Sequence, residues 1–359
     1  MQLTINRNEL LKALKLVGKA IPTRSALPVL RTFNLTAQSG MLRLAATNLE
    51  TYIRQTVPAN IIEPGALCID VLFAEYVSRV DDDEVTMCSE GKKLTVRCGR
   101  NLARFPIIDA AEFPAWPEKL TLLCSVNAGV VSQIVRRVLY AAATDESRPI
   151  LTGVHVQQRE KRLRMTTADG FRLATASAFV SNEAEFKAII PAKAVALLSA
   201  FQTGDLAIAQ PSANETVQVL FYNDSLEILS QVVMGNFPEV QQVIPTTYDT
   251  QVRVKREELL HTCRLLRVFS HVLKLDVGLE QMILTSEPGE AGDSRSVMDV
   301  EMAGKPVRLA VNVNFMIDAL AALDAEFVLL QFIDAEKNPV VIRPDRDEDC
   351  VAVMMPMKV

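Results

Sequence analysis

The chain is 359 residues long, which corresponds to two or three domains at roughly 100–200 residues per domain. With 49% hydrophobic and 23% charged residues it has the composition of a globular protein, which excludes a disordered, collagen-like or small disulfide-rich chain. The formal net charge of −5 argues against a nucleic-acid partner unless the charges are segregated along the chain.

The sequence carries no obvious targeting or metal-binding segment. No apolar run approaches the roughly 20 residues that span a bilayer, and the opening MQLTINRNELLKALKLVG is charged where a secretory signal is apolar. We therefore expect a cytoplasmic protein with no membrane partner. Six cysteines without a C-x-x-C pair and only three histidines predict reduced thiols, no structural zinc and no cofactor.

Three segments have the apolar spacing of an amphipathic helix, at residues 5–21, 126–143 and 254–270. In the first of them Leu10, Leu14 and Val17 recur at three- and four-residue steps and predict one buried stripe. Each segment follows an alternating, strand-like run, so the pattern indicates a repeated strand and helix.

A second short helix also recurs, after Ile69, Ile189 and Leu309, at a step of 120 residues. Its predicted core positions include Val77 and Ile317, and a hairpin-like pair of alternating runs follows each copy. We therefore predict three homologous domains, at residues 1–118, 119–246 and 247–359. Each should hold two helices and about eight strands without βαβ alternation, which favours an α+β fold with antiparallel sheets and helices on one face.

Positive charge gathers on the first helix of each repeat. Segments 6–24, 126–143 and 254–268 hold eleven basic and three acidic residues, a local charge of +8, while the rest of the chain carries −13. In the first segment Lys12, Lys15 and Lys19 share the face opposite the apolar stripe. Such a stripe can be an ordinary solvated face, but its recurrence favours sequence-independent contact with a phosphate backbone.

Motifs along the whole length carry a resemblance to a known family. They are Arg24–Leu30 (RSALPVL), Thr47–Glu50 (TNLE), Thr144–Val154 (TDESRPILTGV), Asp169–Ala174 (DGFRLA), Gly235–Pro238 (GNFP) and Met355–Met357 (MPM). In this order, on a threefold repeat, they resemble the β subunits of bacterial DNA polymerase III, the sliding clamps.

The resemblance implies a homodimeric ring that encircles double-stranded DNA, slides along it, and tethers the replicative polymerase, the clamp loader and other clients. Topological retention lets the affinity for phosphates stay weak enough for sliding. Family position indicates five DNA-facing cations, and the charged stripe adds Lys15 and Lys19. Charge and helix position only, without a family match, add Arg136 and Arg137. The complete set of DNA-binding candidates is Lys12, Lys15, Lys19, Arg24, Arg79, Arg136, Arg137, Arg148 and Lys193.

The family's partner site is a hydrophobic cleft between the second and third domains that receives a short client peptide. The matching residues here are Leu151, Gly170, Phe171, Arg172, Leu173, Pro238, Val243, Val353, Met355, Pro356 and Met357. Methionines adapt to several ligands, although core packing of the last strand would also explain them. Phe171 replaces a common histidine and Gln242 an arginine of some members, which predicts an altered client preference.

The ring interface would pair an edge strand of the first domain, through Arg104, Phe105 and Ile107, with the third domain of the second chain. Residues 271–297 depart from the usual family pattern. Counter-charges expected on the third-domain side are Glu290, Asp293, Asp299 and Glu301.

Two other functions stay open. A hydrolase would use the cluster Asp145, Glu146, Ser147 and His155, but the sequence has no G-x-S-x-G, P-loop or G-x-G-x-x-G motif, and we expect a non-catalytic protein. A divergent clamp paralogue would bind clients or an inhibitor without serving as the main replication clamp.

Overall fold

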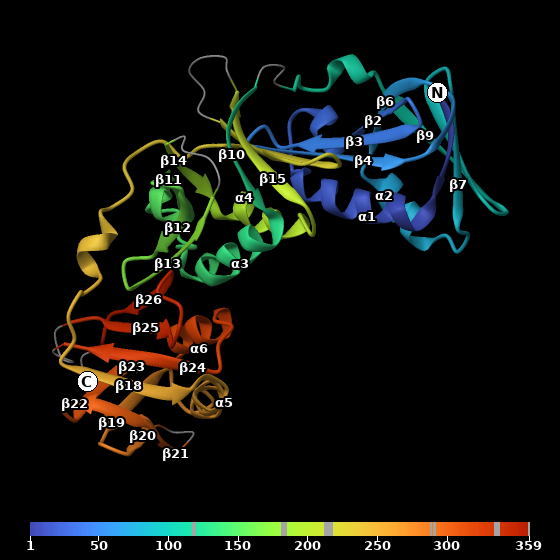
Figure 1. Cartoon of the computed structure of the whole chain (residues 1–359). Helices are drawn as coiled ribbons and strands as arrows, with labels where there is room; N and C mark the ends of the chain where they lie inside the picture. The colour runs from blue at the N-terminus through green and yellow to red at the C-terminus, as the bar shows by residue number, and fades with distance from the viewer. Residues whose placement is uncertain are drawn as a thin grey trace. The chain divides into compact units, whose positions relative to one another are not determined.

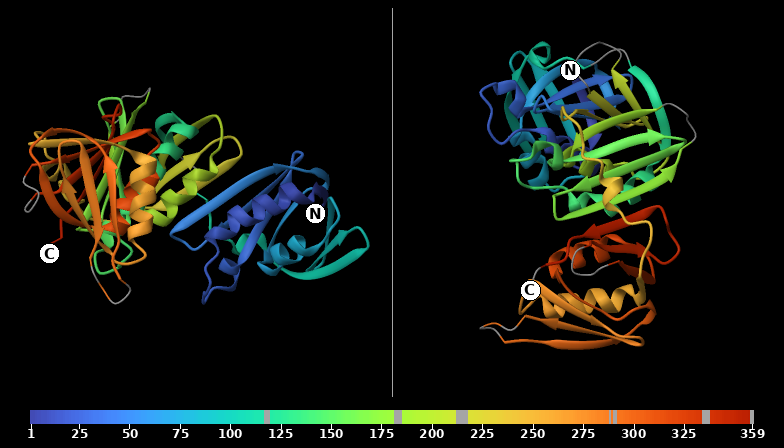
Figure 2. Two further views of the ribbon diagram at one scale, coloured as in Figure 1. Left: turned by 90° about the horizontal axis from the view of Figure 1, so that it is seen from below. Right: turned by 90° about the vertical axis from the view of Figure 1, so that its left-hand side faces the viewer.

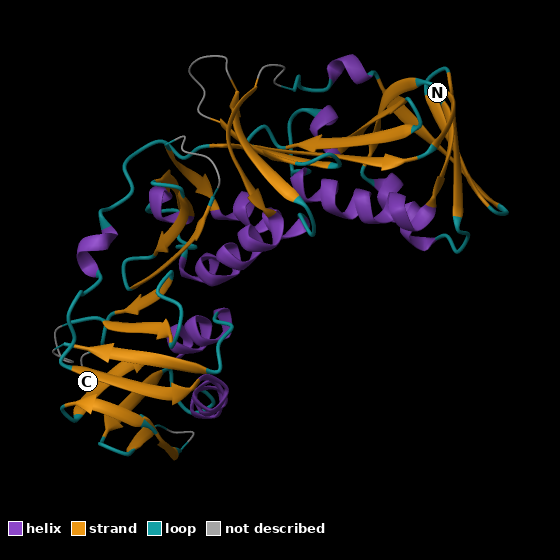
Figure 3. Cartoon of the chain, in the orientation of Figure 1, coloured by secondary structure: helices purple, strands orange, loops and turns teal. Residues whose placement is uncertain are grey.

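The computed structural model describes residues 1–116, 120–180, 185–211, 218–287, 289, 292–333 and 338–357. Among these residues the paired strands are antiparallel, and short helices accompany the sheets (Figure 3). The expected α+β class with antiparallel sheets is confirmed. The chain divides into two compact units: unit 1 is Met1–Ala128 with Leu197–Val232, and unit 2 is Gly129–Ala196 with Val233–Val359 (Figure 1).

Unit 1 is built on one long sheet. Its strands are β1 (Gln2–Asn6), β2 (Thr32–Gln38), β3 (Met41–Thr47), β4 (Thr51–Pro58), β5 (Asn60–Glu63), β6 (Gly65–Asp70), β7 (Glu84–Glu90), β8 (Lys93–Cys98), β9 (Asn101–Ile108), β10 (Leu120–Asn127), β15 (Asp205–Pro211), β16 (Gln218–Tyr222) and β17 (Leu226–Gln231). They form a 13-stranded sheet in the order β10-β15-β16-β17-β4-β3-β2-β6-β9-β8-β7-β1-β5. The pairing of β17 with β4 joins segments that lie far apart in the sequence.

The helices of unit 1 follow the predicted apolar stripe. They are α1 (Arg7–Val17) and α2 (Leu72–Arg79), with 3₁₀ turns η1 (Gly18–Ala20), η2 (Pro28–Arg31), η3 (Ala110–Glu112) and η6 (Leu197–Ala200). The side chain of Asn6 accepts from the backbone N–H groups of Asn8 and Glu9 and so starts α1. The helix α1 packs on β3 and β4 (Figure 2). Its residues Leu10, Leu14 and Val17 are buried.

Unit 2 contains two sheets. Its strands are β11 (Gly153–Arg159), β12 (Arg162–Ala168), β13 (Arg172–Phe179), β14 (Phe186–Pro191), β18 (Thr250–Lys255), β19 (Val272–Val277), β20 (Gln281–Ser286), β21 (Arg295–Asp299), β22 (Glu301–Gly304), β23 (Val307–Asn312), β24 (Phe327–Phe332), β25 (Val340–Pro344) and β26 (Cys350–Met354). The larger sheet runs β14-β11-β12-β13-β26-β25-β24-β18-β22, and the smaller one runs β21-β20-β19-β23. The pairing of β13 with β26 makes the larger sheet continuous.

The helices of unit 2 repeat those of unit 1. They are α3 (Ala128–Val138), whose first residue belongs to unit 1, α4 (Ala192–Ala196), α5 (Arg256–Leu266) and α6 (Val313–Ala322), with η4 (Leu139–Ala141), η5 (Pro149–Thr152) and η7 (Val240–Val243). In α5, Leu259, Cys263 and Leu266 are buried along one stripe. In α6 the Asn312 side chain accepts from the N–H of Asn314 at the first turn.

The threefold element order is present, but the second helix is displaced from the predicted register. The strands before α2, α4 and α6 end at Asp70, Pro191 and Asn312, which are 121 residues apart rather than 120. The displacement is one residue in the second repeat and two in the third, and each residue rotates a helical position by about 100°. Accordingly the expected core position Ile317 is half-buried, while Ala319 is buried. The domain boundaries after residues 118 and 246 remain a prediction.

Candidate functional site

The first candidate surface is the polar face of α1 in unit 1. Lys12, Lys15, Lys19 and Arg24 are all exposed, while the opposite face of the helix is buried. The Lys12 ammonium lies 3.1 Å from Glu9 Oε1, with side chains 73% and 50% exposed. Such a surface pair contributes little and does not immobilise the charge. Four cations therefore stand in water on and just after one helix.

The remaining predicted cations lie on other elements. Arg79 of α2 pairs with Glu75 at 2.6 Å, and Arg136 of α3 lies 3.7 Å from Asp324. Arg79 and Arg136 are exposed, as are two further predicted cations, Arg148 and Lys193. Each can contribute to a positive surface on its own unit, and within the described part of the chain none of the four is held by a buried partner.

The expectation for Arg137 is wrong. Its side chain is only 9% exposed, and Nη1 lies 2.7 Å from the Asp347 carboxylate. Arg136 and Arg137 are neighbours in sequence, but consecutive residues of a helix point about 100° apart. Arg136 consequently faces solvent while Arg137 enters the interior of unit 2 and forms a structural ion pair.

Two further basic residues of the first helices are also structural. Arg7 donates from Nε to Val77 O (3.0 Å) and from Nη2 to Ser78 O (2.9 Å), at the end of α2. Arg256 donates in the same way to Leu320 O in the last turn of α6 and to Ala325 O just after the helix. Helix ends leave such carbonyls without intrahelical donors. Part of the positive charge counted in the sequence therefore belongs to side chains that stabilise the fold through hydrogen bonds to backbone carbonyl groups.

The second candidate surface is an apolar cluster in unit 2. Its buried members are Leu151, Ala168, Leu173, Val341, Val351 and Val353, and Ala143, Phe237, Val240, Ile244 and Tyr248 pack against them half-buried. Leu151, Leu173 and Val353 were predicted from the family resemblance. They come from η5, β13 and β26, so the pairing of β13 with β26 brings them together.

Exposed apolar side chains border this cluster. Phe171 is 66% exposed, Val243 46% and Met355 40%. Three other predicted cleft residues are close in sequence: Pro238 is exposed, and Pro356 and Met357 are half-buried. Exposed apolar groups next to a buried cluster mark an interaction surface rather than isolated surface residues. We call Phe171, Val243 and Met355 the rim of the apolar cluster.

The turn before β13 presents Phe171 to solvent. Asp169 Oδ1 accepts from the N–H groups of Phe171 and Arg172, and Gly170 has a φ of +96°, which a side-chain-bearing residue rarely adopts. The Met355 N–H donates to Phe171 O at 2.8 Å, so the last strand holds the turn in place. Phe171 and Met355 are therefore fixed side by side at the backbone.

Arg172, another predicted cleft residue, is engaged within the chain. Its guanidinium lies 2.9 Å from Asp169 and 2.6 Å from Asp318 of α6, and its Cζ is 4.4 Å from the centre of the Phe315 ring. The side chain is 14% exposed. Arg172 thus links β13 to α6. Its positive charge is largely compensated by Asp169 and Asp318, so little of it is available to a ligand.

Eight residues of the cluster were not predicted as part of the site, and four of them, Phe237, Val240, Ile244 and Tyr248, come from one segment between β17 and β18. Their spacing in NFPEVQQVIPTTY indicates one apolar face, because apolar residues recur at three- and four-residue steps, but it does not indicate what that face packs against. The Phe237 ring stacks on His155 at 5.1 Å. Burial, followed by the charge of Lys187, lowers the pKa of His155 and favours its neutral form.

The third candidate surface is the edge strand β9. Arg104 is exposed, and Phe105 and Ile107 are half-buried. Phe105 packs edge-on against Phe73 and Tyr76 of α2, at 5.9 and 5.7 Å. β9 pairs with β8 along Asn101–Pro106 but with β6 only at Ile107 and Ile108, so over Asn101–Pro106 no described strand covers its other edge.

On the third-domain side, Asp293, Asp299 and Glu301 are exposed, and Glu301 pairs with Arg253 at 3.0 Å. Glu290 lies outside the described residues. Two exposed apolar residues were missed: Leu265 (49% exposed) and Val268 (75%), at the end of α5. Their spacing along the chain does not distinguish them from the buried apolar residues of α5. Their exposure therefore could not be predicted before the packing was known.

The proposed hydrolase cluster does not assemble. Ser147 Oγ donates to Asp145 Oδ2 at 2.6 Å inside an exposed turn, whereas His155 stacks on Phe237.

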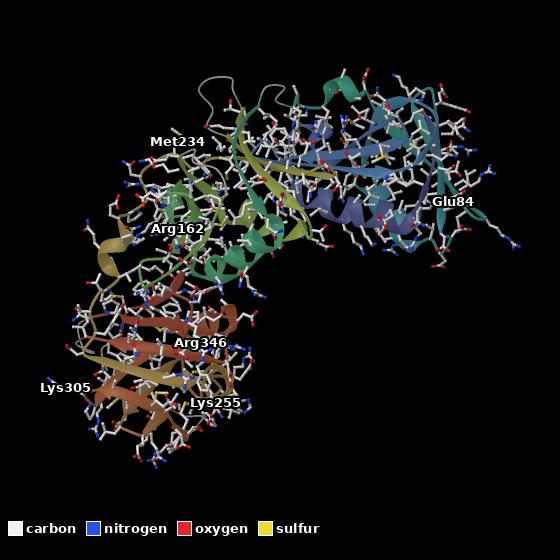
Figure 4. All side chains as sticks on the ribbon, viewed as in Figure 1. Glu84, Arg162, Met234, Lys255, Lys305 and Arg346 are labelled. Carbon is white, nitrogen blue, oxygen red and sulfur yellow. The ribbon has the colours of Figure 1, made fainter. Side chains whose placement is uncertain are left out.

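The described residues contain no group of three potential metal ligands. Within the same part of the chain, no helix is long and apolar enough to cross a membrane. Met234 and Phe179, 75% and 70% exposed, are apolar side chains outside the three surfaces (Met234 is labelled in Figure 4).

Comparison with known proteins covers the whole chain. Models of the DNA polymerase III β subunit match in succession: the N-terminal domain at residues 1–117, the central domain at 125–239 and the C-terminal domain at 241–358. A β sliding clamp of Synechococcus elongatus is 28% identical over 100% of this chain and 99% of its own length. One of Streptococcus pneumoniae is 25% identical over 99% and 98%.

Solved structures agree with the fold. The DNA polymerase sliding clamp of Bacillus subtilis superposes with a TM-score of 0.92 at 23% identity, over 100% of this chain and 99% of that one. The β subunit of Thermotoga maritima DNA polymerase III gives 0.90 at 25% identity, with the same coverage. The similarity spans three clamp domains and is not confined to one motif.

Proposed function

Because the chain belongs to the family of bacterial DNA polymerase III β subunits, the sliding clamps, we propose that it forms a homodimeric ring around double-stranded DNA and tethers client proteins there. The role is non-catalytic, is exercised in the cytoplasm where bacterial DNA lies, and requires no cofactor. The clients are the replicative polymerase, the clamp loader and other proteins that carry a short apolar peptide.

The observation that carries the DNA part of the proposal is the polar face of α1. Lys12, Lys15 and Lys19 are exposed on the side of the helix opposite its buried stripe, and Arg24 follows in an exposed turn. Cations of this kind contact phosphate oxygens without reading bases. Among the described residues none of these cations has a buried partner, which suits a protein that has to slide, because a mobile contact is readily exchanged.

The apolar cluster carries the client part. A peptide that covers Phe171, Val243 and Met355 would remove three exposed apolar side chains from water over a preformed buried base. Burying one such side chain is worth about 1.5–3 kcal/mol, so even partial coverage supports binding of a short peptide. Phe171 adds a large aromatic contact and is the candidate anchor.

DNA retention is tested with the triple variant Lys12→Glu, Lys15→Glu and Lys19→Glu, loaded on nicked circular DNA. We expect the unaltered protein to stay on the circle and to leave once the circle is linearised. The triple variant should be retained far less, and retention equal to that of the unaltered protein would contradict the assignment. A charge-matched control replaces three exposed lysines elsewhere, Lys161, Lys187 and Lys305, with glutamate.

Client binding is tested with a fluorescent peptide from the apolar carboxyl-terminal segment of the same organism's replicative polymerase. Phe171→Ala and Met355→Ala should each weaken binding about tenfold, as expected for loss of an exposed apolar contact of one to two kcal/mol. Phe179→Ala removes an equally exposed phenylalanine from a different surface and should leave the affinity unchanged. Peptide binding without DNA retention would favour the divergent paralogue.

A further inference from the structure

The turn between β3 and β4 in unit 1 repeats the turn that presents Phe171 in unit 2. Asn48 Oδ1 accepts from the N–H groups of Glu50 (3.0 Å) and Thr51 (2.7 Å), and Asp169 Oδ1 accepts from the same two places of its own turn. In both turns the N–H of the first residue also donates to the carbonyl of the fourth. The two turns are therefore equivalent parts of the first and second repeats.

A strand from the next repeat fixes each of these turns. The Gln231 N–H, at the end of β17, donates to Glu50 O at 2.8 Å, and the Met355 N–H donates to Phe171 O at the same distance. In unit 1 the Gln231 side chain adds a hydrogen bond from Nε2 to Leu49 O, also at 2.8 Å. The backbone arrangement around Phe171 is thus repeated in unit 1.

The base beside the turn is repeated as well. Three buried members of the apolar cluster have counterparts in unit 1, because they hold the same places in the 3₁₀ turns and in the strand pairs. The pairs are Leu151 with Leu30, Leu173 with Tyr52, and Val353 with Leu229. Leu30 and Leu229 are buried, and Tyr52 is half-buried. The Trp116 ring lies edge-on to the Tyr52 ring at 6.1 Å, so this base is packed from within the chain.

Two positions next to the turn carry exposed leucines in unit 1 only. Leu49 stands where unit 2 has Gly170, and Leu27, which precedes η2, stands where Arg148 precedes η5. A Cβ added at Gly170 would lie 3.1 Å from Nη1 of Arg148. By the equivalence of the two turns, the side chain of Leu49 is directed toward Leu27. Leu27 is 53% exposed and Leu49 is 38% exposed, so the pair forms an apolar patch in water.

The backbone of Leu49 is strained. Its φ is +76°, in the left-handed region that glycine adopts freely and that a leucine rarely adopts. The strain is maintained by fixed neighbours, because the Leu49 N–H donates to Oγ1 of the buried Thr47 at 2.8 Å and Leu49 O accepts from Gln231. Backbone outliers of this kind gather at binding sites, where the surrounding structure holds a side chain in place. The turn thus holds an apolar side chain in solvent at a position that would suit glycine better.

The charges around the two turns differ. In unit 2 the turn carries the aromatic Phe171 and has the exposed cation Arg148 beside it. In unit 1 the corresponding positions hold Glu50 and Leu27, so a carboxylate stands in place of the aromatic ring and a leucine in place of the cation. Glu50 is exposed and forms no ion pair within the described residues. An apolar pair beside such a carboxylate is complementary to a peptide with apolar and basic side chains, and it repels phosphate.

We propose that Leu27, Leu49 and Glu50 form a second peptide-binding surface, which takes a segment of a partner protein that carries leucine-like side chains next to lysine or arginine. The apolar side chains of the segment cover Leu27 and Leu49, and its cation pairs with the Glu50 carboxylate. This inference rests on the proposed client function for the class of ligand. It differs from that function in the place and in the charge of the segment that is bound.

The test uses two fluorescent hexapeptides, one of alternating leucine and lysine and one of alternating leucine and glutamate, titrated with the full chain at physiological salt and followed by anisotropy. The unaltered protein should bind the lysine peptide more tightly than the glutamate peptide. Leu27→Ala and Leu49→Gly should each weaken binding of the lysine peptide about fivefold. Because glycine suits a φ of +76°, Leu49→Gly should unfold at an unchanged or higher urea concentration, which excludes misfolding as the cause.

Charge reversal tests the part played by Glu50. Glu50→Lys should lower the affinity for the lysine peptide and raise the affinity for the glutamate peptide, so that the preference is inverted. Matched controls alter equally exposed residues on other surfaces: Leu279→Ala removes a leucine that is 66% exposed, and Glu84→Lys reverses an exposed carboxylate. Both controls should bind like the unaltered protein. Equal losses in the controls would reveal a general attraction to an acidic chain and would overturn the proposal.

Phe171→Ala separates this surface from the apolar cluster, because it should weaken binding of the client peptide and leave the lysine peptide unaffected. A lysine peptide that responds to Phe171→Ala and not to Leu49→Gly overturns the second surface and leaves the client function standing. If only the lysine peptide binds, and Leu49→Gly weakens it, the second surface stands and the client function fails. DNA is the competing ligand, because the exposed Arg24 lies three residues before Leu27. A short DNA duplex whose binding depends on Leu49, without binding of the lysine peptide, would also overturn the proposal.

Discussion

Replacement of Arg172 by alanine tests how the apolar cluster is held together. The variant removes the ion pairs to Asp169 and Asp318 and the contact with Phe315, all within unit 2. A hydrogen bond to a charged group contributes about 1.5–3 kcal/mol, and a cation over an aromatic ring about 1 kcal/mol. Asp318 is 42% exposed and regains water, so its share is discounted. We expect a loss of about 3 kcal/mol in the local opening free energy.

Hydrogen–deuterium exchange measures this locally, because global unfolding of a chain with two compact units need not be two-state. Amides of β13 and β26 that exchange by local opening should do so about a hundredfold faster in Arg172→Ala, since each 1.4 kcal/mol is a factor of ten. Amides of β3 and β4 in unit 1 serve as an internal control. Asp318→Asn keeps the bond to Asp169 and should produce a smaller acceleration.

An exchange rate in β13 and β26 that rises less than about threefold would contradict this prediction, because it corresponds to a loss of less than about 0.7 kcal/mol in the local opening free energy. An equal increase in unit 1 would also count against it, because the effect would then be general rather than local. If the local increase is observed, the client peptide should bind Arg172→Ala more weakly through loss of the preformed surface.

Three further predictions concern other elements. Arg137→Leu should lower the free energy of unfolding by about 2 kcal/mol, because it breaks a largely buried ion pair, yet leave retention on circular DNA unchanged. Burial lowers the pKa of His155 below 6.5, so the contribution of His155 to stability is complete above pH 6.5 and is lost as the pH falls through the lowered pKa. The variant His155→Gln should therefore show a weaker loss of stability over this pH range, measured by urea unfolding. Ile228→Ala, which removes a fully buried side chain where β17 pairs with β4, should lower the free energy of unfolding by about 3 kcal/mol, measured by the fluorescence of Trp116.

Arg136 and Arg137 are neighbours whose different exposure could not be predicted from the sequence. Both were expected to face DNA, because charge and helix position treat them alike. In the structure their environments differ, because Asp347, which is distant in sequence, lies next to α3 and forms an ion pair with Arg137 only. Arg7 and Arg256 make the same point, because the carbonyl groups that they bind lie some 65 to 70 residues away in sequence.

The candidate client surface was predicted only in part. Leu151, Leu173 and Val353 were assigned to one site through family resemblance, and the structure places all three in one buried cluster, while their role in client binding stays a prediction. Phe237 and Tyr248 could not be assigned to it from sequence, because their contribution depends on where the segment between β17 and β18 folds back. Helical or strand periodicity carries no information on such a return.

The amino-acid pattern by itself determined the local elements, since a 3.6-residue apolar period or a two-residue alternation acts over neighbouring residues. The threefold repeat, the buried stripe of α1 and the exposed face with Lys12 belong to that level. Tertiary structure alone decided which strands pair across repeats, β17 with β4 and β26 with β13. Backbone hydrogen bonds between strands are alike for every sequence, so the choice of partner comes from the packing of the whole chain.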